Sequence, residues 1–75
     1  MNEEHLARIQ AIAEAALLAA GKPLSLEQLR ELFGEDERPA RQVMEHALMM
    51  LEQSCEGRGF ELSKVASGYR LQVRE

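Results

Sequence analysis

The alternation of apolar and polar residues near the end of the chain constrains the fold more than any other feature. Residues 56–74 read as two strands joined by a tight turn at Ser67-Gly68, where glycine tolerates positive φ. The predicted pairs are Ala66 with Tyr69, Lys64 with Leu71 and Leu62 with Val73. Because side chains alternate across a strand, this register gathers one apolar face. That face consists of Phe60, Leu62, Ala66, Tyr69, Leu71 and Val73.

Two helices are predicted in the first half of the chain. The first is expected from about Glu3 to Ala20, where glycine and proline soon follow and end it. The second is expected from Leu26 to Phe33. Ser25 and Gln28 have the spacing of a capping box, in which each side chain bonds the other residue's backbone N–H.

A third helix is expected to begin in the acidic run 35–37, because carboxylates complement the positive end of a helix dipole. It should continue to about Ser54, with an apolar face towards the core. The opposite face holds Arg38, Arg41, Gln42, Glu45, His46, Met49 and Gln53. The order helix, helix, helix, strand, strand predicts a mostly α winged-helix fold, as one domain over residues 1–75.

The first predicted helix is apolar on two sides. One stripe, from Leu6 to Ala20, is the expected core face, and the far side carries a second stripe. The second stripe consists of Ala7, Ala11, Ala15 and Leu18. A helix that is apolar nearly all round is buried on both sides, and a domain this small has nothing to cover the second one. Alanine also suits an exposed helix face, but Leu18 favours a contact between two copies, and hence a homodimer.

The charges of the chain are unevenly distributed. The net charge is −4, with five basic and eleven acidic residues in 1–57, and four basic and two acidic residues in 58–75. A DNA-binding winged helix is the alternative reading, because its third helix and basic wing would contact DNA. The acids of the third helix argue against phosphate contacts. A protein-partner surface formed by Met49, Lys64 and Arg70 is the other interpretation.

The sequence favours no catalytic, metal or cofactor site. His5, His46 and Cys55 are the only imidazole and thiol side chains, and they lack the spacing of a zinc site. A single cysteine suits a reducing compartment. The apolar run 9–21 is too short to cross a membrane, and acids stand where a signal peptide would carry lysines. We therefore expect a non-enzymatic cytoplasmic protein without a membrane contact.

Three blocks of sequence resemble one bacterial family. They are AEAALLAAGKPLSLEQLRELF (13–33), GRGFEL (57–62) and VASGYRLQVR (65–74). Together they resemble segregation and condensation protein B, an accessory subunit of the chromosome-condensing SMC–kleisin complex. The resemblance implies a nucleoid-associated scaffold with two successive winged-helix domains, of which this chain would be the first. It also implies dimerisation through that domain, and binding of the kleisin subunit (segregation and condensation protein A) and, through it, of the SMC protein.

Overall fold

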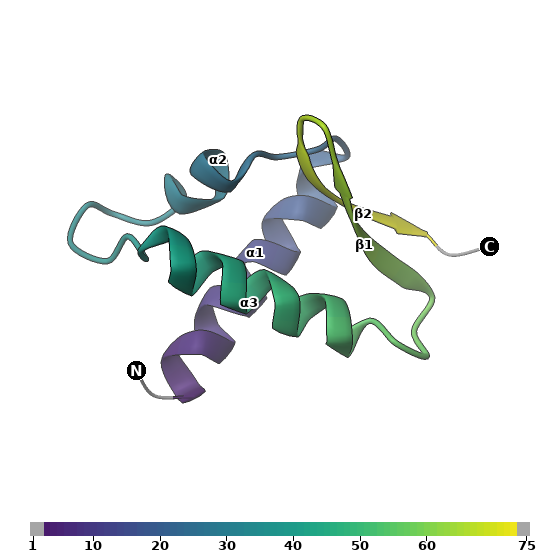
Figure 1. The fold of residues 1–75 in the computed structure, drawn as a ribbon, viewed down its shortest axis with the longest axis horizontal. Helices are drawn as coiled ribbons and strands as arrows, with labels where there is room; N and C mark the ends of the chain where they lie inside the picture. Colours follow the sequence, from purple (N-terminus) through teal and green to yellow (C-terminus); the bar gives the residue numbers. More distant parts are fainter. Residues whose placement is uncertain (1–2, 74–75) are drawn as a thin grey trace.

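The computed structural model describes residues 3–73 and has the predicted order of elements (Figure 1). They are α1 (Glu3–Ala20), α2 (Leu26–Arg30), α3 (Arg41–Ser54), β1 (Phe60–Val65) and β2 (Gly68–Val73). The helices α1 and α3 cross, and the antiparallel hairpin of β1 and β2 stands beside them, with its tip near the connection between α1 and α2 (Figure 1).

The core lies where α1, α2, α3 and the hairpin meet. Its buried members are Ile9, Ala13, Leu17, Leu29, Phe33, Met44, Ala47, Leu48, Leu51, Cys55 and Leu62. The helix predicted over Glu3 to Ala20 has those bounds, and its buried residues belong to the stripe expected to face the core. Cys55 is buried as a small apolar side chain.

The start of α2 is capped as predicted. The backbone N–H of Gln28 donates to the Ser25 hydroxyl at 3.1 Å, and the Ser25 N–H donates to the Gln28 side-chain oxygen at 2.8 Å. The helix ends at Arg30, so the prediction that it reaches Phe33 was wrong. Tighter turns follow, because the N–H of Phe33 bonds the carbonyl of Arg30, three residues back.

The start of α3 also differs from the prediction. The acidic residues 35–37 form a turn, in which the Glu37 N–H bonds the Gly34 carbonyl at 2.9 Å, and α3 begins at Arg41. The reason is Pro39, whose ring disfavours helical geometry at the preceding residue. Ala40, extended at φ −64° and ψ 159°, then serves as the N-cap.

The hairpin has a different register from the one predicted. Its pairs include Phe60 with Val73, Leu62 with Leu71, Lys64 with Tyr69 and Val65 with Gly68, and the turn is formed by residues 66–67. The predicted pairs were therefore wrong by two positions. Because a shift of two keeps every side chain on its face, the apolar face is retained apart from Ala66, which lies in the turn.

The glycine of the hairpin serves a contact outside the turn. Gly68 has φ 142° and is the first residue of β2. Next to it, the Leu24 N–H donates to the Tyr69 carbonyl at 2.9 Å, and the Tyr69 N–H donates to the Leu24 carbonyl at 2.7 Å. A Cβ atom at Gly68 would overlap the carbonyl oxygen of Leu24. The connection between α1 and α2 therefore runs against β2 at a position that only glycine permits.

Candidate protein-interaction surfaces

The second apolar stripe of α1 faces solvent in the protomer. We call Ala7, Ala11, Ala15 and Leu18 the outer stripe; all four are exposed, and Leu18 is 55% exposed. Their helical spacing places them on one side of α1, away from Ile9, Ala13 and Leu17 in the core. The prediction that the outer stripe contacts a second copy remains a prediction.

Charged side chains border the outer stripe. On one side, Arg8 forms an ion pair with Glu37 at 3.5 Å, and on the other, Glu14 pairs with Arg58 at 3.6 Å. The spacing of the helix puts Arg8 and Glu14 on opposite borders of the stripe. The stripe is thus a narrow apolar band between a cation and an anion.

A second surface lies between α3 and the hairpin. A groove of about 210 Å³, which we call the wing groove, is lined by Glu45, Leu48, Met49, Glu52, Leu62, Lys64 and Tyr69. Met49 is 48% exposed, and the Lys64 ammonium lies 5.9 Å from the centre of the Tyr69 ring. The groove therefore combines an accessible apolar side chain with charges of both signs.

The structure brings together two of the three residues predicted as a partner surface. Met49 and Lys64 line the wing groove. Arg70 pairs with Ser63 in the hairpin, so it points to the opposite face from Lys64. Sequence reasoning did not assign Glu45 and Glu52 to this surface, although their spacing from Met49, four residues before and three after, indicates one face of a helix.

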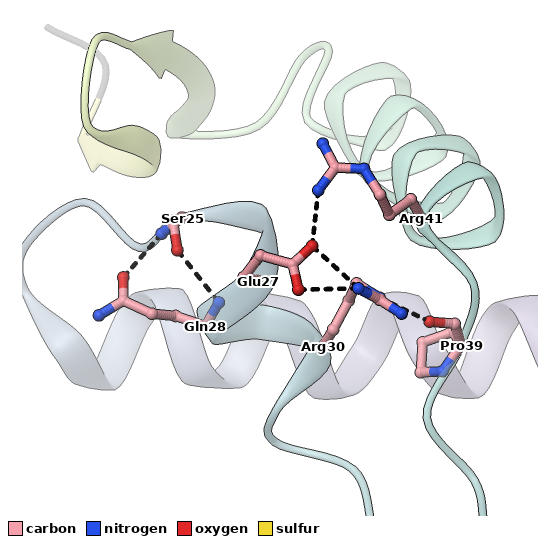
Figure 2. A network of polar contacts seen from close by, with 6 residues as sticks. All are labelled: Ser25, Glu27, Gln28, Arg30, Pro39 and Arg41. Carbon is pink, nitrogen blue, oxygen red and sulfur yellow. Dashed lines mark hydrogen bonds and ion pairs between the residues drawn. The ribbon is translucent and has the colours of Figure 1, made fainter. Parts of the chain in front are cut away.

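A polar network fixes α2 against the start of α3 (Figure 2). The carboxylate of Glu27 accepts hydrogen bonds from Arg30 at 2.8 and 2.9 Å and from Arg41 at 2.6 Å. Arg30 also donates from Nε to the Pro39 carbonyl at 2.9 Å. Arg41, on the face that reads DNA in helix-turn-helix proteins, is therefore held by a carboxylate of its own chain.

The hydrogen bond from Arg30, followed by the charges of Arg30 and Arg41, lowers the pKa of Glu27 below its usual 4.5. A lowered folded-state pKa contributes stability above the unfolded-state pKa, and this contribution is lost as pH falls through the folded value. We expect Glu27→Gln to flatten the loss of stability below about pH 4.5, measured by urea unfolding at a series of pH values. Glu31→Gln is the control, because Glu31 is exposed and has no ion pair within residues 3–73. Equal acid sensitivity of Glu27→Gln and the parent chain would contradict this expectation.

The histidines and the cysteine differ in their exposure to solvent. His5 and His46 are exposed on α1 and α3, and Cys55 is buried. Over residues 3–73, no group of three His, Cys, Asp or Glu side chains is arranged to hold a metal ion. In the same part of the chain, no helix has the length and apolar character to span a membrane.

Comparison with known proteins shows the family to which the chain belongs. The family model described as segregation and condensation complex subunit ScpB matches residues 11–75. The chain belongs to the ScpB family. A segregation and condensation protein B homolog from Coxiella burnetii is 40% identical over 63 residues, which cover 84% of this chain and 30% of the relative. A ScpB relative from Syntrophotalea carbinolica is 42% identical over 66 residues, covering 88% of this chain and 32% of the relative.

The ScpB relatives are thus much longer than this chain, which spans less than a third of their length. Among solved structures, a crystal structure of a dimer of the ScpB N-terminal domain complexed with ScpA peptide matches with a TM-score of 0.75 and 29% identity. The match covers 88% of this chain and 75% of that chain. It confirms the predicted winged-helix fold and the resemblance on which the ScpB assignment rested.

Proposed function

We propose that this chain is a non-catalytic dimerisation domain of a complex that condenses and segregates chromosomes. The observation that carries the proposal is the outer stripe of α1, an apolar face that the domain does not cover itself. Membership of the ScpB family supports it, as does the dimeric state of the matching N-terminal domain. In this proposal the chain is the first of two winged-helix domains of a longer cytoplasmic, nucleoid-associated protein.

The outer stripe has a symmetry that suits two copies. Its residues, together with Glu4, have the same spacing in both directions from Ala11. In an antiparallel pair of α1 helices crossing at Ala11, Ala7 of one copy lies opposite Ala15 of the other, as an isologous contact requires.

The proposed partners are a second copy, the kleisin subunit and, through the kleisin, the SMC protein. The matching ScpB structure holds an ScpA peptide, which supports a kleisin contact for this chain. The function is then to hold other proteins in a fixed arrangement. Burial of apolar surface supplies the binding energy, at about 25 cal/mol per Å².

Sedimentation equilibrium tests the dimer directly. We expect a mass of twice 8.5 kDa at high micromolar concentration, falling towards the monomer on dilution. A strict monomer throughout that range would overturn the proposal. Titration with duplex DNA at low salt is the companion measurement, and we expect no tight, steeply salt-dependent binding, because Glu45 and Glu52 face the wing groove.

A further inference from the structure

The outer edge of β1 has open hydrogen-bonding groups. Both backbone groups of Tyr69 bond Leu24, on the side of β2 that faces away from β1. In an antiparallel ladder, the pair of Lys64 and Tyr69 therefore exchanges no hydrogen bonds. Because pairs with and without hydrogen bonds alternate along the ladder, the pair of Leu62 and Leu71 and the pair of Phe60 and Val73 also exchange no hydrogen bonds.

The N–H and C=O groups of Phe60, Leu62 and Lys64 consequently point outward from the hairpin. No other backbone group within residues 3–73 bonds them. An edge strand of this kind is a template for another extended chain. Peptide-binding domains use such edges by adding a strand to the sheet, with main-chain bonds providing affinity and side-chain pockets providing specificity.

The wing groove adjoins this edge, because Leu62 and Lys64 belong to both. Along its α3 side, Met49 lies between Glu45 and Glu52 on the exposed face of the helix. Neither carboxylate has an ion pair in the part of the chain that the structure describes. The groove thus presents an apolar contact flanked by two available negative charges.

We propose that an extended peptide segment of a partner protein adds as a strand to the open edge of β1. Its apolar side chain packs on Met49, and a lysine or arginine side chain lies beside Glu45 or Glu52. In taking the kleisin subunit as the source of this segment, the inference rests on the proposed function. Two carboxylates beside the strand edge favour a basic peptide over the phosphates of DNA.

The binding site can be mapped by NMR with overlapping synthetic peptides that cover the kleisin subunit. We expect one peptide to slow the hydrogen exchange of the Phe60, Leu62 and Lys64 amides at least tenfold, since these amides become bonded. Protection of the outer stripe alone, or no binding by any peptide, would overturn the inference. The solution mass of the same sample reports separately on the dimer, so the two proposals fail independently.

A charge in the groove provides a second test. Met49→Lys should weaken peptide binding about tenfold without unfolding the domain, because Met49 is half-exposed and the new ammonium group replaces the apolar contact and repels the basic side chain of the peptide. The control is Gln53→Lys, which adds the same charge to an exposed position of α3 outside the groove. Equal affinities of these two variants would place the peptide elsewhere.

Methylated peptides test strand addition without altering the protein. Methyl groups on alternate backbone nitrogens of the bound segment should reduce affinity at least tenfold in one register, where the N–H groups face β1. In the other register the N–H groups point to solvent, so affinity should change less than threefold. Equal effects in both registers would exclude strand addition.

Discussion

Leu18→Glu should convert the dimer into a folded monomer. Leu18 is 55% exposed in the protomer, so the substitution leaves the core unchanged. In the antiparallel arrangement it puts a carboxylate into the apolar band, opposite Glu4 of the second copy, and an unpaired charge is costly to bury. We expect self-association to weaken at least 100-fold, or about 2.8 kcal/mol, as measured by sedimentation equilibrium.

Leu32→Glu is the matched control for this prediction. Leu32 is 49% exposed and follows α2, outside the outer stripe. It should retain the dimer, and circular dichroism should show that both variants are folded. If Leu18→Glu stays dimeric, or if both variants dissociate alike, the dimer contact lies on another surface.

Gly68→Ala should destabilise the domain strongly. The substitution adds a Cβ at φ 142° and places it against the carbonyl of Leu24, where backbone rather than a flexible side chain must move. We expect a loss of at least about 2 kcal/mol in the free energy of unfolding, since strained backbone alone costs 1–3 kcal/mol. For a domain this small, that loss corresponds to a fall in Tm of roughly 10 °C.

Gly59→Ala is the corresponding control. Gly59 has no positive φ, and a Cβ there meets no atom within 4 Å. Its stability should change by less than about 1 kcal/mol, in either direction. If urea unfolding gives Gly68→Ala the same stability as Gly59→Ala, the close contact between Leu24 and β2 is not formed as described.

Local signals in the sequence predicted local structure well. The bounds of α1 and the capping box at Ser25 were correct because neighbouring residues determine them. The start of α3 was misplaced because the acidic run 35–37 was weighed by its charge, while Pro39 controls the backbone there. The register was misplaced because Gly68 was assigned to the turn. The glycine is instead required by the close approach of the Leu24 backbone, a contact that no neighbouring residue in the sequence indicates.

The candidate surfaces were predictable to a similar extent. Met49 was recognisable as an apolar residue on a polar helix face, and it does line a groove with Lys64. Arg70 was grouped with them by charge, but strand alternation turns it to the other face. The open edge of β1 could not be predicted, because it depends on whether the chain before α2 pairs with β1 or with β2.

The bond pair between Leu24 and Tyr69 also bears on how the domain forms during translation. All three helices precede Tyr69 in the chain, so they emerge from the ribosome before it and can associate early. The amide and carbonyl of Leu24 must meanwhile be solvated by water, because buried backbone groups without partners are rare. Completion of the native topology therefore waits until β2 emerges from the exit tunnel.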